Sequence, residues 1–157
     1  MFRSMIATSM FIALGAGGAL AQNDVCIDPN TRQIDQQGTE AWQYIAQNTD
    51  PSLVQALTGT WYTEVVAANT GQIDYQYNIY EANGLFQYRS RVCSGSACSD
   101  YDGHGFFAVM PTGDGTMTTM LIVSDLNRDR QCSGASSRFL DANTMQTSTG
   151  QVWQRVQ

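Results

Sequence analysis

Residue types that could carry chemistry are scarce in this chain of 157 residues. His104 is the only histidine, and it lies in an Asp-Gly-His-Gly stretch beside further acidic residues. An unperturbed imidazole titrates near neutral pH and can therefore act as a base or a ligand. Nucleophilic catalysis also needs an activated nucleophile and an orienting partner, and the sequence shows no pattern that supplies them. We predict no catalytic residues and expect the protein not to be an enzyme.

A second candidate for chemistry is the stretch Asp125-x-Asn127-x-Asp129, which has the spacing of the first half of a calcium-binding loop. Arg130 stands where such a loop needs its turn glycine, and Ser136 stands where it needs a bidentate glutamate. We therefore expect no metal here. The glycine-containing loops match no phosphate-binding motif, so we also expect no cofactor.

The four cysteines are the next reactive set, and they are Cys26, Cys93, Cys98 and Cys132. A single histidine and the lack of a C-x-x-C pair argue against zinc, and an even count in an exported chain favours two disulfides. Three connectivities are possible, of which we favour Cys93–Cys98 with Cys26–Cys132. The second bridge would tie the N-terminal segment to the rest and, by closing the longer loop, would stabilise more.

The N-terminal segment reads as an export signal. Arg3 provides a positive start, an apolar stretch follows, and Ala19-Leu20-Ala21 is a suitable cleavage site. The apolar stretch is too short to span a membrane, which takes about 20 residues. We expect a signal peptide over residues 1–21, a lead-in with short helices over 22–57 and a barrel over 58–157. The mature protein would be periplasmic or secreted.

The charge balance excludes one class of partner. Residues 22–157 contain seven arginines, no lysine and fourteen acidic residues, a formal charge of −7. Nucleic-acid binding requires a clustered basic face, which this composition does not provide. Arg89 and Arg91 form the densest basic spot and read as a solvated pair. The acidity mainly favours solubility.

The periodicity predicts two short helices followed by eight short strands. Residues 39–48 and 51–57 read as helices, with Thr39 as the cap of the first and Thr49 or Asp50 as the cap of the second, before Pro51. Regular spacing with tight turns is typical of an up-and-down barrel or a sandwich. The expected fold class is all-β, with about eight antiparallel strands over 60–68, 73–82, 85–93, 106–111, 116–124, 136–140, 144–148 and 151–156.

Two tight turns set the expected strand registers. Asn83-Gly84 predicts a two-residue hairpin turn pairing Ala82 with Leu85. That register collects aromatic residues on one face, namely Tyr75, Tyr77, Phe86 and Tyr88, and leaves polar residues on the other. Asp114-Gly115 predicts a second hairpin pairing Gly113 with Thr116, so that Phe106, Ala108 and Met110 would lie beside Thr119, Leu121 and Val123. Both faces of that pair are apolar, so one would line the barrel and the other would need the N-terminal helix or a second subunit to cover it.

The residues Gly59-Thr60-Trp61-Tyr62 resemble the start of the first strand in the calycins, the group of lipocalins, fatty-acid-binding proteins and avidins. The resemblance implies a small barrel whose tryptophan packs across the floor against a basic residue of the last strand. Arg155 is the matching residue here. The start Leu57-x-Gly59-x-Trp61 is also similar to a small periplasmic barrel that inhibits secreted metalloproteases.

The expected function is the binding of a small hydrophobic or amphipathic ligand inside the barrel. The aromatic face would form the wall, and Trp61 with Arg155 would close the floor. The alternative is a protein-binding barrel, such as a periplasmic protease inhibitor, whose interior is filled by its own side chains. The predicted ligand-binding residues are Trp61, Tyr75, Tyr77, Phe86, Tyr88 and Arg155.

Overall fold

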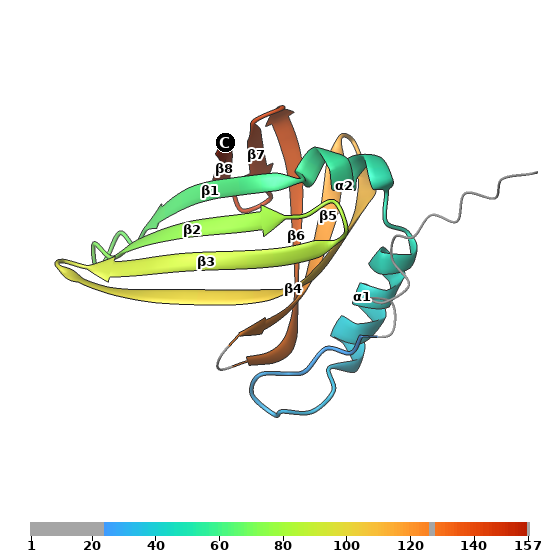
Figure 1. The fold of residues 1–157 in the computed structure, drawn as a ribbon, viewed down its shortest axis with the longest axis horizontal. Helices are drawn as coiled ribbons and strands as arrows, with labels where there is room; N and C mark the ends of the chain where they lie inside the picture. Colours follow the sequence, from blue (N-terminus) through green and yellow to red (C-terminus); the bar gives the residue numbers. More distant parts are fainter. Residues whose placement is uncertain (1–23, 126–127, 157) are drawn as a thin grey trace, which may run out of the picture.

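The computed structural model describes residues 24–125 and 128–156, and it confirms the all-β fold class with a closed antiparallel barrel of eight strands (Figure 1). Each strand pairs with its neighbours in the sequence, and β8 pairs with β1 to close the barrel. The predicted signal peptide, residues 1–21, lies outside the described residues. The strands are β1 (Gly59–Val66), β2 (Ile73–Tyr80), β3 (Leu85–Ser94), β4 (Ala97–Gly113), β5 (Thr116–Asp125), β6 (Arg128–Asp141), β7 (Thr144–Thr147) and β8 (Val152–Val156).

Two strands are much longer than the sequence pattern predicted. β4 begins at Ala97 rather than at Phe106, and β6 begins at Arg128 rather than at Ser136. The stretches between the predicted strands, 93–105 and 125–134, were expected to be loops, and this expectation was wrong from Ala97 and from Arg128 onward. Both stretches are polar, and polarity is typical of loops. Here they continue the backbone ladders beyond the apolar core, where side chains on neither face need to be apolar.

The two helices, α1 (Gln36–Gln47) and α2 (Pro51–Leu57), precede the barrel. Asp35, not Thr39, caps α1, because its side chain accepts a hydrogen bond from the Gly38 backbone N–H. A Cβ on Gly38 would lie only 2.3 Å from the Asp35 carboxylate, so this cap requires glycine. Asp50 caps α2 ahead of Pro51, one of the two caps considered from the sequence. No helix in the described part of the chain is long and apolar enough to cross a membrane.

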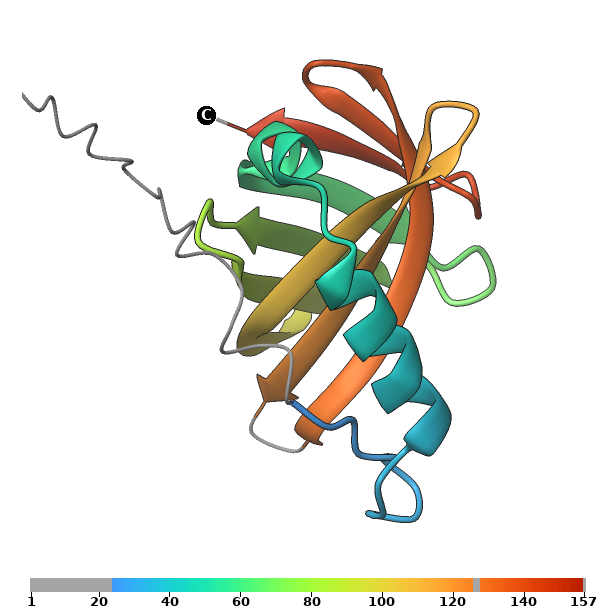
Figure 2. The same ribbon diagram turned by 90° about the vertical axis from the view of Figure 1, so that its right-hand side faces the viewer.

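Helix α1 covers the apolar outer face of the barrel. Figure 2 shows α1 lying across the outside of β4, β5 and β6. Its buried Trp42 and Ile45 pack with Ala108, Met120 and Ile122 of the sheet. A strand pair that is apolar on both faces must be covered twice, once by the barrel core and once by another element. The N-terminal helix α1 is that element. The sequence had left the choice between this helix and a second subunit.

Both disulfides have the favoured connectivity. Cys26–Cys132 joins the segment before α1 to β6, and Cys93–Cys98 closes the β3–β4 hairpin. The buried Cys26 also donates its backbone N–H to the Thr39 hydroxyl. The first bridge therefore holds α1 against the barrel. Structural disulfides persist in oxidising compartments, so the two bridges favour an extracytoplasmic environment.

The register of the β2–β3 hairpin differs by one residue from the prediction. Tyr80 pairs with Phe86 and Asn78 with Tyr88, whereas the two-residue turn required Ala82 to pair with Leu85. The connection is instead a three-residue loop in which the Gly84 N–H bonds to the Glu81 carbonyl and only Gly84 has a positive φ, of 87°. A slip of one residue moves every side chain of one strand to the opposite face. The predicted aromatic face is therefore wrong.

The β4–β5 pair shows a similar shift. Gly113 pairs with Thr116 as predicted, but a bulge between Pro111 and Gly113 moves the rest of the ladder, so that Val109 pairs with Thr119 and Ala108 with Met120. Phe106, Ala108 and Met110 therefore face outward with Met120 and Ile122. The inner face carries Phe107, Val109, Thr119, Leu121 and Val123.

The two disulfides should differ in their contributions to stability. Replacing Cys26 and Cys132 by serine removes a bridge between residues 106 positions apart in the sequence. Replacing Cys93 and Cys98 removes a bridge between residues only 5 positions apart. Loop-closure entropy predicts losses of about 5 kcal/mol and about 2 kcal/mol respectively in the free energy of unfolding. Denaturant unfolding of both double variants measures the losses. A larger loss for the Cys93/Cys98 variant would contradict this account.

Candidate functional site

The floor of the barrel is built around Trp61 at the start of β1. Its side chain is fully buried, and its indole N–H donates a 2.7 Å hydrogen bond to the Leu57 carbonyl at the end of α2. The guanidinium carbon of Arg155 lies 4.4 Å from the centre of the indole ring. The same guanidinium donates to the carbonyls of Ala56 and Thr58. Arg155 therefore joins β8, the first strand and the end of α2.

Gly59 makes this arrangement possible. Its φ of 131° lies in the region that favours glycine, and a Cβ there would lie 2.9 Å from Arg155 Nη1. The spacing Gly-x-Trp thus has a local physical reason. The glycine lets the arginine approach the backbone, and the tryptophan two residues later points to the same face of the strand, beneath that arginine.

Side chains fill the half of the barrel next to this floor. Tyr80 lies with its ring centre 5.1 Å from that of Phe86 and 5.0 Å from that of Phe107. Burial raises the pKa of the Tyr80 hydroxyl far above its ordinary value. The rest of this packed layer is supplied by Leu57, Trp61, Val109, Met117, Met145 and Trp153. This half of the interior is core.

The other half contains a cavity of about 590 Å³. Its apolar lining comes from Phe86 and Tyr88 of β3 and from Leu121 and Val123 of β5. Gly103 faces Tyr88, and a Cβ on Gly103 would come within 2.3 Å of the tyrosine ring. Glycine at position 103 therefore leaves room for the Tyr88 ring. The polar lining comes from Asp74, Gln76, Asn78, Ser90, Gln131 and Ser133.

A chain of hydrogen bonds orders part of this polar lining. Gln151 Nε2 donates to Gln76 Oε1 over 3.3 Å, and Gln76 Nε2 donates to Asp74 Oδ2 over 2.6 Å. The Ser90 hydroxyl donates to the other oxygen of Asp74 over 2.5 Å. Residues from β2, β3 and the segment before β8 thus converge on one carboxylate in the cavity wall.

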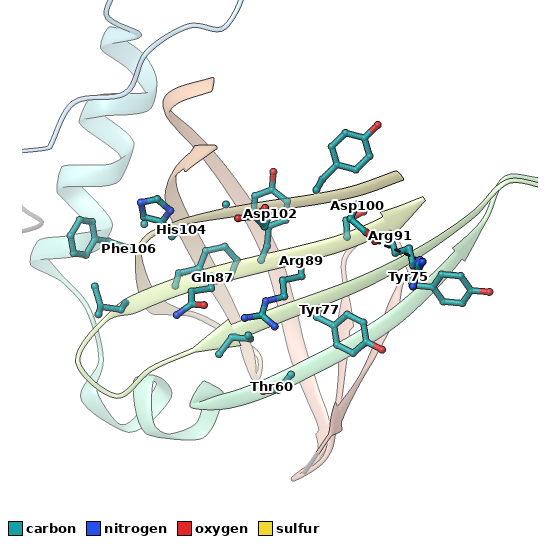
Figure 3. Close-up of a pocket in the computed structure, with 18 residues that line it drawn as sticks. Thr60, Tyr75, Tyr77, Gln87, Arg89, Arg91, Asp100, Asp102, His104 and Phe106 are labelled. Carbon is teal, nitrogen blue, oxygen red and sulfur yellow. Dashed lines mark ion pairs between the residues drawn. The ribbon is translucent and has the colours of Figure 1, made fainter. Parts of the chain in front are cut away.

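The structure divides the six predicted ligand-binding residues among three places. Trp61 and Arg155 form the floor, and Phe86 and Tyr88 line the inner wall. Tyr75 and Tyr77 project from the outer face of β2, as Figure 3 shows, so their predicted place inside the barrel is wrong. The cause is the three-residue loop between β2 and β3, which sets Tyr77 opposite Arg89 instead of Ser90.

The outer face of β1 to β4 carries a groove of about 1180 Å³ with a repeated pattern across the strands. One cross-strand row runs Tyr62, Tyr77, Arg89 and Asp102, and the next runs Glu64, Tyr75, Arg91 and Asp100. The rings of Tyr62 and Tyr77 lie 4.9 Å apart. Arg91 Nε lies 3.5 Å from the Asp100 carboxylate, with both side chains largely exposed. Figure 3 shows the members of these rows that line the groove, namely Tyr75, Tyr77, Arg89, Arg91, Asp100 and Asp102.

His104 lies on this outer face, away from the cavity. It pairs with Gln87 of β3 and Ser124 of β5 and lines the groove. Within residues 24–125 and 128–156, no three metal-binding side chains gather at one point. Asn127 and the side chains of Asp125 and Asp129 lie outside the part that the structure describes, so the calcium-loop spacing stays a sequence observation.

Sequence reasoning missed the polar half of the cavity. Asp74 and Gln76 alternate with tyrosines along β2, and the polar face of a strand is normally the outer one. The available signal was the alternative loop at Asn83-Gly84. A three-residue connection turns Asp74, Gln76 and Asn78 inward and places them with Phe86 and Tyr88.

The floor predicts a large loss of stability for Trp61→Ala. The variant removes a fully buried indole, its bond to Leu57 and its contact with Arg155, so the free energy of unfolding should fall by about 3–5 kcal/mol. The matched control is Tyr77→Ala, which removes an aromatic contact on the outer face and should cost about 1 kcal/mol. Denaturant unfolding measures both. A loss below about 0.5 kcal/mol for Trp61→Ala would contradict the floor arrangement.

The buried Tyr80 predicts a specific sensitivity to alkaline pH. Its pKa is higher in the folded state than in the unfolded chain, so its contribution to stability is complete below about pH 10 and falls as the pH rises beyond that. Tyr80→Phe has no proton to lose, and its unfolding free energy should decline less between about pH 9 and 11. Tyr101→Phe, a change at an exposed ring, is the control. Parallel pH profiles for Tyr80→Phe and the unaltered protein would refute the assignment.

Comparison with known proteins identifies no relative from which a function could be carried over. None of the family models, curated proteins or solved structures compared with this chain matches it significantly. A barrel architecture by itself is compatible with many functions. The function must therefore be argued from the side chains of the cavity and of the outer groove.

Proposed function

We propose that this is an exported, non-enzymatic, lipocalin-like protein that holds a small amphipathic molecule in the open half of its barrel. The observation that carries the proposal is the mixed lining of the interior cavity. Phe86, Tyr88, Leu121 and Val123 offer an apolar wall, and a hydrogen-bonded polar cluster ending at Asp74 offers a second, distinct surface. A ligand with one apolar and one polar part satisfies both.

The size of the cavity supports this proposal. Its volume of about 590 Å³ falls in the range of roughly 300–1,000 Å³ that is usual for small-molecule sites. Eight-stranded barrels are either filled by side chains or hold one small ligand. This barrel combines the two, because its aromatic core fills the floor and leaves the other half open.

The calycin resemblance supports the same class of function. Its two motif residues, Trp61 and Arg155, are in contact, and Gly59 leaves the Arg155 guanidinium room beside the backbone. In this proposal they hold the floor and do not touch the ligand. The ligand would instead contact Phe86 and Tyr88, while Tyr75 and Tyr77 take no part. The two disulfides and the predicted signal peptide support export to the periplasm or beyond.

The alternative, a protein-binding barrel such as a protease inhibitor, is favoured by a different observation. The outer groove presents Tyr75 and Tyr77 beside Arg89 and Arg91, and Tyr62 contacts Tyr77 at its edge. Tyrosine and arginine are enriched in protein interfaces and at their energetic centres, and lysine is depleted. In this alternative the cavity would be a by-product of barrel packing, and the outer face would carry the function.

Blocking the cavity tests the choice between the two functions. Ser133 of β6 pairs with Leu121 and faces the cavity, so Ser133→Trp would place an indole in the ligand's space without removing a buried side chain. The exposed Ser136 lies on the outer face of the same strand, and Ser136→Trp is the matched control. We expect native mass spectrometry of protein exported in cells to show a small bound mass that is lost on denaturation. Ser133→Trp should remove it and Ser136→Trp should retain it.

Two results would overturn the proposal. One is the absence of any bound mass together with no thermal shift by apolar dyes or simple amphiphiles. The other is a bound mass that Ser133→Trp leaves unchanged. If Tyr77→Ala and Arg89→Ala removed binding to a captured protein while the cavity stayed empty, the protein-binding alternative would replace it.

A further inference from the structure

Asp74 is unusual among the residues that line the cavity. Of the described side chains that point into this space, it alone carries a charge. Arg89 also borders the cavity, but its register places it opposite Tyr77 and Asp102 on the outer face. None of the ion pairs found among the described residues involves Asp74. Among the side chains that the structure describes, the cavity therefore has one negative charge and no cation facing it.

The Asp74 carboxylate accepts hydrogen bonds from two neighbouring side chains, one on each oxygen. Gln151 donates to the amide oxygen of Gln76, which leaves the Gln76 NH₂ group to donate to one oxygen of Asp74. Ser90 donates to the other oxygen. A carboxylate has about four acceptor positions, so two of them remain for a ligand. The donors hold the carboxylate in one orientation, and such preorganisation lowers the cost of binding.

A carboxylate that is fixed and half-buried in a cavity wall discriminates between ligand head groups. A head group that carries an ammonium would form a charge-assisted hydrogen bond with Asp74, which is stronger than a bond between neutral groups. An anionic head group would meet a like charge, and no described arginine points into the cavity to compensate. A neutral hydroxyl head group would fall between the two.

We propose that Asp74 selects the ligand's polar part, and that the preferred ligands are amphiphiles with a cationic, hydrogen-bond-donating head and not fatty-acid-like anions. The apolar tail would lie against Phe86, Tyr88, Leu121 and Val123. This inference rests on the proposed function, because it specifies which amphipathic molecules the cavity accepts. It makes Asp74 a specificity-determining residue, with Gln76 and Ser90 as its positioning residues.

The test compares three probes that share one alkyl chain, namely decylamine, decanol and decanoate. Each is titrated calorimetrically into the purified protein below its micellar concentration, at pH 7.5 and low salt. We expect decylamine to bind most tightly and decanoate most weakly, with at least about a tenfold ratio between them. Asp74→Asn should reduce that ratio to near one while leaving decanol binding almost unchanged.

Asp102→Asn is the matched control, because it removes the same charge from the exposed outer face of β4, two strands away from Asp74. It reports any attraction of the amine by the net acidity of the chain. We expect Asp102→Asn to keep the preference for decylamine, and Ser90→Ala to weaken it partly. Circular dichroism of each variant verifies the fold.

The outcomes separate this inference from the function on which it rests. If none of the three probes binds and Ser133→Trp has no effect on any bound mass, the carrier function itself fails. If all three bind with similar affinity, or decanoate binds most tightly, the carrier function stands and the role of Asp74 is wrong. If Asp102→Asn lowers the ratio as much as Asp74→Asn does, the preference comes from overall charge and the inference is also wrong.

Discussion

The contact between Arg155 and Trp61 is the constraint on which the rest of this barrel depends. Strand β8 is short and meets β1 through only a few paired residues, so its ladder with β1 is a weak closure. Arg155 adds a cation–π contact and two hydrogen bonds to the end of α2, where the helix leaves its last carbonyls without partners. One side chain thus closes the barrel, caps a helix and seals the floor.

The sealed floor determines where a ligand can lie. Trp61 and the aromatic rings around Tyr80 occupy the space next to α2, so the open volume is confined to the half between Tyr88 and Leu121. The wall of that half changes from apolar to polar toward Asp74. A site with such a gradient orients an amphipathic molecule as well as containing it. The packed floor of the barrel therefore holds the walls of the open cavity in position.

The outer groove differs from the cavity in its electrostatics. Its arginines lie in rows between tyrosines and aspartates, and the Arg91–Asp100 pair is largely exposed to solvent. Exposed ion pairs of this kind contribute little to stability, about 0–1 kcal/mol each. The rows of charged and aromatic residues therefore affect which partners the surface can contact more than they affect the stability of the barrel. Among the described side chains, the cavity carries one charge without a facing cation, whereas the groove carries an Arg91–Asp100 ion pair.

The sequence alone determined the class of fold, and it favoured the observed disulfide pairing among three and named Asp50 as one of two possible caps of α2. The contact between Trp61 and Arg155 was implied by the resemblance to the calycins. The fold class and the cap depend on residue type and local patterning, which can be read from short stretches. Only the tertiary structure decided which face of each strand is inside. Asn83-Gly84 is compatible with loops of two or three residues, and that single-residue difference moved Tyr77 to the surface and Asp74 into the cavity. The polar starts of β4 and β6 were missed for a related reason, because backbone ladders continue where the apolar pattern has already ended.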